Sequence, residues 1–576
     1  MKKARHGATA QSFVPPPGAE ALEPGPLDRH FARLLVDLHG TPNAAVELGA
    51  QMASAWRGAG HICVPLAELG LEALAAALRD SSVVGAPGTQ HPLILDARDR
   101  LYLQRYWAYE QALAAALRAR LDGPAAHDPA LLADGLRRFF GDDAEPNDQR
   151  TAAATVVERR FGVITGGPGT GKTRTVVVIL ALLIEQFAAR GVRPRIALAA
   201  PTGKAGARLK ESILKTAGEL MLPDAVRAAL PGDASTLHRL LGAIPDSPYF
   251  RHDASRPLAV DAVIVDEASM VDLALMAKLV AAVPATARLI LLGDKDQLAS
   301  VDAGYVLGDI CQSPPGAAVP IVALQKNYRF GNDSGIYRLS AAVNSGAADS
   351  ALELLRAGTH RDLAFAHLPV AAGLAAALRG PVVERYRAYL TAAEPREALR
   401  QLNGFRVLCA VRGGPFGVEN MNRLVEQLLA DTGLIDPAKP FYAGRPVLIL
   451  RNDPQLKLFN GDVGLLLPDR EAGGEVRAFF LEADGGLRRL LPARLPEHET
   501  AFAMTVHKSQ GSEFERLLLL LPDRDTPVAT RELVYTGITR ARSSVEVWAV
   551  EAVLRAAIAR RTIRASGLRE ALWGVA

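Results

Sequence analysis

Cysteine is scarce in this chain of 576 residues, with only Cys63, Cys311 and Cys409 present. The three lie far apart and form no CxxC pair, which argues against a zinc or iron–sulfur site. Three separated cysteines also cannot provide a disulfide framework. Reduced thiols are typical of a cytoplasmic protein, and we expect that location.

Long hydrophobic runs are also missing. The longest, from Val176 to Ile184, is far shorter than the roughly 20 residues that a membrane span needs. The chain begins with Met-Lys-Lys, but no apolar segment of a signal peptide follows. Residues 8–27 are rich in Ala, Pro and Gly, and we predict that residues 1–27 form a flexible N-terminal segment. We therefore expect no contact with a membrane.

A large excess of one charge is absent as well. The chain has 66 Lys and Arg against 62 Asp and Glu, a net charge of +4. This excess is too small to indicate nucleic acid as a partner, although a local basic groove can exist within a nearly balanced total. Hydrophobic residues make up 49% and charged residues 22% of the chain, as in ordinary globular proteins. At about 100–200 residues per domain, the length predicts three or four domains.

The hydrophobic pattern changes along the chain and divides it into parts. Residues 28–121 repeat Leu and Ala at helical spacing, which predicts a helical domain for packing or partner docking. Residues 122–146 are acidic and rich in turn residues, and predict a linker. In 147–345 and again in 346–576, short apolar runs alternate with helical patterns, which predicts two α/β domains with parallel sheets. Short strands at about 443–497 predict a β-rich insert in the second.

A phosphate-binding loop follows the predicted strand 161–165 and precedes a predicted helix at 174–187, which is the context that the motif GxxxxGK[ST] requires. Glycines allow backbone N–H groups to surround phosphates, and the helix N-terminus adds a partial positive charge. Lys172 would reach the β- and γ-phosphates of ATP, and Thr173 would ligate Mg²⁺. The residues expected to bind the nucleotide here are Gly166, Gly167, Pro168, Gly169, Thr170, Gly171, Lys172 and Thr173.

Polar residues follow two further predicted strands. Asp266 and Glu267 end the apolar run 262–265. Asp266 would hold Mg²⁺ directly or through water, and Glu267 would act as general base on the attacking water. A charged strand end at the surface is the alternative for this pair. Gln297 follows the next strand and could bridge the γ-phosphate to the rest of the protein.

These segments resemble the motifs of superfamily-one helicases. The sequences DEASM at 266–270 and GDKDQL at 293–298 are similar to motifs II and III. The other motifs occur in the family's order: NDQ at 147–149, with Gln149 as the adenine reader, APTGKA at 200–205 (motif Ia), NYR at 327–329 (motif IV), TVHKSQGSE at 505–513 (motif V) and VYTGITRA at 534–541 (motif VI).

Other segments resemble the RecD branch of these helicases. They are GAGHICVPL at 58–66, TLHRLLG at 236–242, FRH at 250–252 with PL at 257–258, and LCAVRGGPFG at 408–417. Lys204 departs from the pattern, since Arg is often expected there. Lysine keeps the charge but loses bidentate phosphate geometry. The resemblance implies two RecA-like P-loop domains with parallel sheets, a helical N-terminal domain and a small SH3-like insert in the second RecA-like domain.

The resemblance also implies an activity. A member of this family is expected to be an ATP-dependent 5′–3′ DNA helicase subunit of RecBCD (exodeoxyribonuclease V), acting in double-strand break repair, homologous recombination and DNA degradation. ATP and Mg²⁺ are the implied cofactors. Single-stranded DNA, duplex ends, and the RecB and RecC subunits are the implied partners. The N-terminal domain would dock on RecC, and the nuclease activity is expected on RecB.

The resemblance further assigns residues to charge stabilisation and to DNA. Arg329 and Arg540 are similar to arginine fingers that face each other across a cleft, although either could instead form a surface ion pair. Single-stranded DNA would run across both RecA-like domains and be held by its phosphates. The expected contacts are Thr202, Lys204, Thr505, His507 and Lys508. A packing role suits His507 equally well.

Three other functions remain open at this point. The motor could work alone, as a RecD-like helicase without partners. It could be a regulatory subunit that binds ATP with little turnover, although the intact Lys172, Glu267, Gln297 and Arg540 argue against that. It could also act on RNA, since contacts to the backbone do not select DNA, and here only the RecD-like segments favour DNA.

Overall fold

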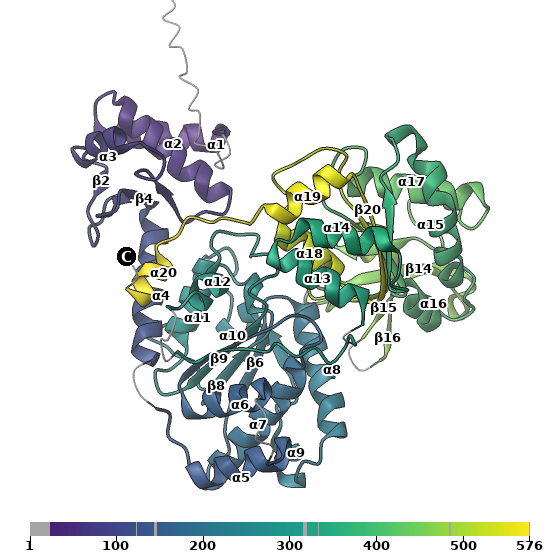
Figure 1. Ribbon diagram of the computed structural model, residues 1–576, viewed down its shortest axis with the longest axis horizontal. Helices are drawn as coiled ribbons and strands as arrows, with labels where there is room; N and C mark the ends of the chain where they lie inside the picture. Colours follow the sequence, from purple (N-terminus) through teal and green to yellow (C-terminus); the bar gives the residue numbers. More distant parts are fainter. Residues whose placement is uncertain are drawn as a thin grey trace, which may run out of the picture.

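The computed structural model describes residues 23–121, 124–142, 147–314, 319–331, 333–482 and 485–574. Most of the predicted flexible segment 1–27 lies outside these ranges. Within them, the strands form two parallel sheets, one antiparallel sheet and one small sheet in the N-terminal region (Figure 1). No helix in these ranges is long and apolar enough to cross a bilayer. The predicted α/β fold class is confirmed.

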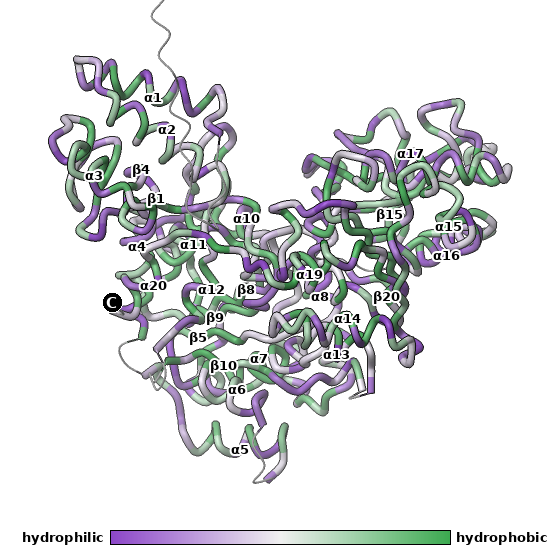
Figure 2. Tube along the Cα trace, turned by 45° about the horizontal axis from the view of Figure 1, so that its top comes forward, coloured by the Kyte–Doolittle hydropathy of each residue, from purple (hydrophilic) through white to green (hydrophobic). Residues whose placement is uncertain are grey.

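The first parallel sheet carries the predicted phosphate-binding loop. Its spatial order is β10 (Ile321–Ala323), β5 (Phe161–Thr165), β9 (Arg288–Gly293), β8 (Ala262–Val265), β6 (Ile196–Ala200) and β7 (Ala234–Thr236). The inner strands read as continuous apolar runs because helices cover both faces. Figure 2 shows the apolar residues gathered along β5, β8 and β9.

Helices from distant parts of the chain cover the two faces of this sheet. One core contains residues of α6 (Asp148–Glu158), α7 (Lys172–Ala188), α8 (Gly203–Glu219) and α9 (Asp224–Ala229). The other contains residues of α4 (Gln104–Leu121), α10 (Leu237–Leu241), α11 (Leu273–Ala282) and α12 (Val306–Cys311). The strand ends are thereby fixed between two apolar layers.

The second parallel sheet has the order β11 (Leu363–His367), β20 (Ala541–Ala549), β19 (Phe514–Leu520), β12 (Phe405–Cys409) and β18 (Ala503–Thr505). One face packs on α13 (Gly335–Ser345), α14 (Ala348–Ala357), α18 (Arg531–Ile538) and α19 (Glu551–Ala559). The other packs on α15 (Leu374–Leu390), α16 (Pro395–Leu402) and α17 (Val418–Asp431). The two α/β domains lie side by side in Figure 1.

The predicted β-rich insert is an antiparallel sheet between α17 and β18. Its order is β16 (Leu487–Leu490), β15 (Glu475–Leu481), β14 (Val463–Asp469), β13 (Pro446–Ile449) and β17 (His498–Thr500). Apolar residues of β13, β14 and β15, together with Leu458, form a small core of its own. The last strand lies just past the predicted boundary at 497.

The N-terminal region contains the predicted helices and also a sheet that the sequence analysis missed. The helices are α1 (Pro26–His39), α2 (Ala44–Gly58), α3 (Glu72–Arg79) and α4. The sheet has the order β1 (Cys63–Pro65), β4 (Arg100–Leu103), β3 (Leu93–Leu95) and β2 (Val84–Gly85). Its strands are too short to show a repeating pattern in the sequence.

The segment 122–146, predicted as a linker, contains helix α5 (Pro129–Phe140). Asp128 caps it, because its side chain accepts hydrogen bonds from the Ala130 and Leu131 N–H groups. Leu132 and Leu136 lie one turn apart and are buried against α7. The helical spacing of these two leucines was missed in the sequence because turn residues surround the helix on both sides.

The last part of the chain leaves the second α/β domain. After α19 it runs back across the molecule, and α20 (Leu568–Trp573) packs against α4 and α12 (Figure 1). Leu568 and Leu572 belong to the same apolar core as Ile62 and Leu113. The end of the predicted domain 346–576 is therefore joined to the N-terminal region.

Candidate nucleotide-binding and catalytic site

The predicted phosphate-binding loop connects β5 to α7 and depends on glycine at two positions. Gly169 and Gly171 have φ values of +85° and +82°, which residues with a side chain rarely adopt. A Cβ atom on Gly169 would lie 2.5 Å from Arg329 Cβ, and one on Gly171 would collide with the Gln149 amide. The glycines thus allow two other segments to approach the loop closely.

A cavity of about 420 Å³ lies between the two α/β domains, in front of this loop. Both domains contribute to its lining, as does the segment after β10. All seven predicted catalytic and metal-binding residues line it together: Lys172, Thr173, Asp266, Glu267, Gln297, Arg329 and Arg540. The structure thus brings the predicted catalytic and metal-binding residues to one place.

The Lys172 ammonium group folds back onto its own loop. It donates hydrogen bonds to the carbonyl oxygens of Gly166 and Gly167, the latter at 3.1 Å. A flexible cation held only by carbonyl groups can turn towards a phosphate chain when one binds, since a phosphate offers it a full negative charge. The position of Lys172 therefore suits the predicted contact with the β- and γ-phosphates.

Asp266 and Glu267 lie at the end of β8, opposite Lys172. Burial, together with the neighbouring Glu267, raises the pKa of Asp266 to about 6, and Lys172 acts in the other direction. Carboxylate and hydroxyl oxygens, as in Asp266 and Thr173, are the hard ligands that Mg²⁺ prefers. Among the described residues, no group of three or more His, Cys, Asp or Glu could hold a metal alone. A Mg²⁺ ion here would need phosphate and water ligands as well, which is usual for this ion.

The backbone of Glu267 has an unusual conformation. Its φ and ψ of 51° and 39° are left-handed, and its N–H donates a 2.9 Å hydrogen bond to the Asp266 carboxylate. Residues other than glycine adopt this conformation rarely, and the strain persists mainly at functional sites. The turn directs the Glu267 side chain into the cavity, where a general base would be required.

Gln297 is buried and links the cavity to the second α/β domain. Its amide donates a 2.9 Å hydrogen bond to Asp294 Oδ2. The Tyr535 hydroxyl of α18 donates to the same oxygen at 3.1 Å. The next residue, Leu298, donates from its N–H to Thr536 Oγ1 at 3.0 Å. This arrangement suits the predicted bridging role of Gln297.

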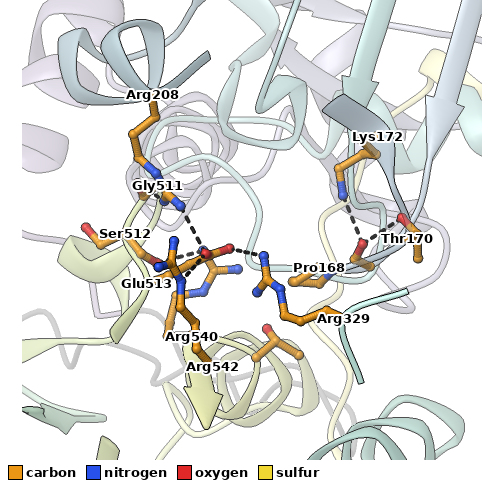
Figure 3. Close-up of polar contacts among 12 residues, drawn as sticks. Pro168, Thr170, Lys172, Arg208, Arg329, Gly511, Ser512, Glu513, Arg540 and Arg542 are labelled. Atoms are coloured by element: carbon orange, nitrogen blue, oxygen red, sulfur yellow. Dashed lines mark hydrogen bonds and ion pairs between the residues drawn. The ribbon is translucent and has the colours of Figure 1, made fainter. Parts of the chain in front are cut away.

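The two predicted arginine fingers differ in their surroundings (Figure 3). Arg540 is 3% exposed, and burial lowers its pKa from the ordinary value. It donates to Ser512 O at 3.3 Å. Arg329 pairs with Glu513 at 2.7 Å, and 28% of its side chain is exposed. The alternative of a surface ion pair is therefore wrong for Arg540, whereas Arg329 does form an ion pair, inside the cavity.

Gln149, the predicted adenine reader, lies outside this cavity but next to it. Its amide donates to Thr170 O at 3.2 Å. It lines a small pocket of about 70 Å³ together with Lys326 and Tyr328. Tyr328 is 53% exposed, and its aromatic ring offers a flat surface for a base. The sequence analysis included Tyr328 in the NYR segment but assigned it no role, although an aromatic residue directly before Arg329 is a signal for base stacking.

Two of the predicted DNA contacts follow β6 in the first α/β domain. Thr202 caps helix α8, because its hydroxyl accepts a 3.2 Å hydrogen bond from the Ala205 N–H. Burial and the nearby Arg208 and Arg406 lower the pKa of Lys204 to about 8, while Asp462 of the β-rich insert acts in the other direction. Lys204 therefore lies between the first domain and the insert.

The other three follow β18 in the second α/β domain. Thr505 Oγ1 accepts a 3.2 Å hydrogen bond from the Lys508 N–H. The Lys508 ammonium pairs with Glu499 at 2.8 Å. Burial and the nearby Arg564 lower the pKa of His507, so its ring is largely neutral near pH 7. The surroundings of His507 favour the packing role that the sequence left open.

The sequence analysis missed a cluster of charges around Glu513 (Figure 3). Arg208 and Arg542 pair with this carboxylate at 3.1 and 2.9 Å, in addition to Arg329. Burial by itself would raise the pKa of Glu513, but the arginines lower it to about 2. Glu513 was visible as part of motif V, but its partners come from segments far away in the sequence.

Comparison with known proteins adds three matching family profiles. The profile of an AAA domain matches residues 149–303, and that of a UvrD-like helicase C-terminal domain matches residues 500–547. The profile of the RecBCD enzyme subunit RecD N-terminal domain matches residues 24–77. The first two cover the phosphate-binding loop and motif V, respectively.

Curated relatives match over most of the chain. The RecBCD enzyme subunit RecD of Mycolicibacterium smegmatis is 41% identical over 96% of this chain and 98% of its own length. That of Haemophilus influenzae is 38% identical over 76% of this chain and 74% of its own. The ATP-dependent RecD2 DNA helicase of Deinococcus radiodurans is 31% identical over 79% of this chain but only 56% of its own. A solved Pif1 helicase from Bacteroides matches 70% of this chain and 92% of its own at 17% identity and a TM-score of 0.37, too weak for an inference. On the strength of the full-length relatives, this chain belongs to the RecD family of RecBCD enzyme subunits.

Proposed function

We propose that this chain is an ATP-dependent DNA helicase subunit of an exodeoxyribonuclease of the RecBCD type. The observation that carries the proposal is the cavity of about 420 Å³ that Lys172 and Glu267 of one α/β domain share with Arg540 of the other. A site built from two domains can convert hydrolysis into movement, because the nucleotide contacts both. The RecD relatives support the same activity.

The residues of the cavity suit transfer of the γ-phosphoryl group to water. Lys172 and the loop N–H groups would hold the β- and γ-phosphates. Thr173 and Asp266 would hold Mg²⁺, which when bound neutralises charge on the phosphates. Glu267 would orient the attacking water and take its proton while the bond between the γ-phosphorus and the ADP oxygen breaks. Phosphate and ADP are the products.

Arg329 and Arg540 would stabilise the charge that spreads over the γ-phosphoryl oxygens. A residue of this kind typically contributes about 10³–10⁵ in rate. Tyr328 would stack on the adenine base, and Gln149 would recognise its edge. Nucleotide binding would draw the two α/β domains together, because Lys172 and Arg540 would contact the phosphates from different domains.

The predicted DNA contacts lie on both sides of this cleft. Thr202 and Lys204 follow β6 in one domain, and Thr505 and Lys508 follow β18 in the other. These are hydroxyl and ammonium donors, which suit phosphates better than bases. Closing and opening of the cleft would change the distance between the two pairs and so advance the chain along single-stranded DNA. We propose that this movement runs from 5′ to 3′.

The partner subunits would be of the RecB and RecC type, as the names of the relatives imply. Three leucines of α1, Leu27, Leu34 and Leu38, are 76%, 55% and 60% exposed and share one face of the helix. Exposed apolar faces of this kind mark interaction sites. We propose that the N-terminal region docks on the RecC-type subunit, that the nuclease lies on the RecB-type subunit, and that the complex works in the cytoplasm.

One experiment tests the proposal directly. ATP hydrolysis by the purified chain is measured with and without single-stranded DNA, and unwinding is then measured on duplexes with 5′ or 3′ tails. We expect strong stimulation by DNA and a preference for 5′ tails. A chain that binds ATP but hydrolyses it equally slowly with DNA and with the added partner subunits would be a regulatory subunit and not a motor.

A further inference from the structure

Glu513 occupies the wall of the nucleotide cavity with its carboxylate directed at arginines (Figure 3). Its side chain is 11% exposed. The arginine nitrogens lie 2.7 Å away for Arg329, 2.9 Å for Arg542 and 3.1 Å for Arg208. One nearly buried carboxylate is thus surrounded by three guanidinium groups.

The three arginines come from both α/β domains. Arg208 lies on α8 and Arg329 follows β10, so both belong to the first domain. Glu513 precedes β19, and Arg542 lies on β20, the strand that pairs with β19 in the second domain. The ion pairs of Glu513 with Arg208 and Arg329 therefore cross the cleft, whereas its pair with Arg542 stays within one domain.

A carboxylate and a phosphoryl group are alternative ligands for the same arginines. Guanidinium groups bind both through paired N–H donors. The arginines keep Glu513 ionised, as its pKa of about 2 shows. Arg329 is one of the two residues assigned above to the γ-phosphoryl group. Its Nη2 group donates to Glu513 Oε1, so a phosphate that takes this donor has to replace the carboxylate.

We propose that Glu513 is an internal anion that holds Arg208 and Arg329 in the nucleotide-free state, so that an incoming γ-phosphoryl group has to displace it. The inference rests on the proposed function, since it concerns the same cavity. When Glu513 is displaced from Arg208 and Arg329, its ion pair with Arg542 remains and still compensates the negative charge of the carboxylate. After hydrolysis, Glu513 recaptures Arg329 and so favours release of phosphate.

The Glu513 carboxylate would thus compete with a triphosphate for the same arginines. A residue that merely holds the loop in shape would weaken nucleotide binding when it is replaced. A competing anion does the reverse, because its removal leaves the partly buried guanidinium groups of Arg208 and Arg329 without their negative partner. The direction of the change in affinity therefore separates the two roles.

The test compares the full chain with Glu513→Gln and with the control Glu515→Gln. Glu515 is not part of the cavity lining, although it pairs with Arg542, which is, and accepts a hydrogen bond from the Ser543 hydroxyl. Its variant makes the same charge change next to the cavity. Dissociation constants of ADP and of the triphosphate analogue adenylyl imidodiphosphate are measured by calorimetry. We expect Glu513→Gln to bind the analogue about tenfold more tightly, the equivalent of one charge-assisted hydrogen bond, with the ADP constant unchanged. Glu515→Gln should match the wild type.

Inorganic phosphate provides a second measurement on the same proteins. Its inhibition of ATP hydrolysis in the presence of ADP should strengthen in Glu513→Gln. An analogue affinity that is unchanged or weaker in this variant would overturn the inference while leaving the proposed function intact. A wild type that binds neither ADP nor the analogue would overturn both. If Glu513→Gln does not fold, Glu513→Asp, with its shorter arm, should still bind the analogue more tightly than the wild type, and equal binding would refute the proposal.

Discussion

The hydroxyl group of Tyr535 donates a hydrogen bond to Asp294 Oδ2 at 3.1 Å. Asp294 belongs to the first α/β domain and Tyr535 to the second. Gln297 donates to the same carboxylate oxygen at 2.9 Å. A residue that lines the nucleotide cavity and a residue of the second domain therefore share one acceptor. This contact is a direct physical link between the site of hydrolysis and the neighbouring domain.

Replacing Tyr535 by Phe should loosen this link. The buried Asp294 would lose one donor, which typically costs about 1–3 kcal/mol. We expect a lower melting temperature and ATP hydrolysis about tenfold slower, with the affinity for ADP unchanged. Differential scanning fluorimetry and steady-state hydrolysis with DNA measure the two effects. Unchanged hydrolysis would mean that Gln297 keeps its position without Tyr535.

Replacing Lys172 by Gln should abolish hydrolysis of ATP in the presence of DNA. The variant lacks the ammonium group that we assign to the β- and γ-phosphates, whereas its fold should persist because Lys172 contacts only carbonyl groups of its own loop. The expected loss is at least about 10²-fold in rate. Circular dichroism controls for folding, and turnover like that of the wild type would refute the role of the loop.

Replacing Glu267 by Gln should separate binding from chemistry. The side chain keeps its size but can no longer accept a proton, so hydrolysis should slow by about 10²–10⁴-fold. Nucleotide should still bind, which equilibrium binding of a fluorescent ATP analogue would show. If nucleotide binding is lost as well, the role of Glu267 is to stabilise the left-handed turn after β8, and not to act in the reaction.

Replacing Lys508 by Gln should weaken binding to single-stranded DNA and reduce its dependence on salt. Each lost phosphate contact lowers the slope of log K against log salt by about 0.7. The matched control is Lys215→Gln, which removes the same charge from the exposed surface of α8. Fluorescence anisotropy at several salt concentrations measures the slope. Equal slopes for both variants would contradict a phosphate contact at Lys508.

Glu110 should make the stability of the protein depend on pH. Burial raises its pKa from 4.5 to about 7, although the Gly567 N–H and the Ser566 hydroxyl donate to it at 2.8 and 3.0 Å. The folded state therefore holds a proton that the unfolded chain releases. The free energy of unfolding should fall as pH rises from about 4.5 to 7, by up to about 3 kcal/mol, and then level off.

The variant Glu110→Gln cannot titrate and should lack this component. Relative to the wild type, it should gain stability as pH rises from 5 to 8. Urea unfolding at several pH values measures the difference. Glu68→Gln, at an exposed position, serves as the control with the same change of charge. A constant difference between Glu110→Gln and the wild type would show that Glu110 does not titrate in this range.

The parts of the site that the sequence predicted are those that local patterns encode. The phosphate-binding loop and the carboxylates after β8 each lie within a short segment whose strand, turn and helix are readable. The helices of the N-terminal region and the β-rich insert were readable for the same reason. The role of each residue in catalysis or in DNA binding stays a prediction that the variants above test.

Contacts between distant segments could not be predicted in this way. Arg329 and Glu513 lie 184 positions apart, and no periodicity connects them. Arg208 is on a helix whose pattern predicts only that the residue is not in the core. The strands β1 to β4 were missed because they are very short, and α5 because turn residues surround it. In each case the tertiary contacts decide the structure.

The return of α20 to the N-terminal region has a consequence for the order of folding. Arg100 and Glu570 form an ion pair at 3.1 Å although 470 positions separate them. A ribosome synthesises α4 long before α20, and until α20 arrives, the apolar surface that Leu568 and Leu572 cover is exposed to water. The region around α4 is therefore made early but completed late, and translation that stops before residue 568 leaves this region without part of its apolar core.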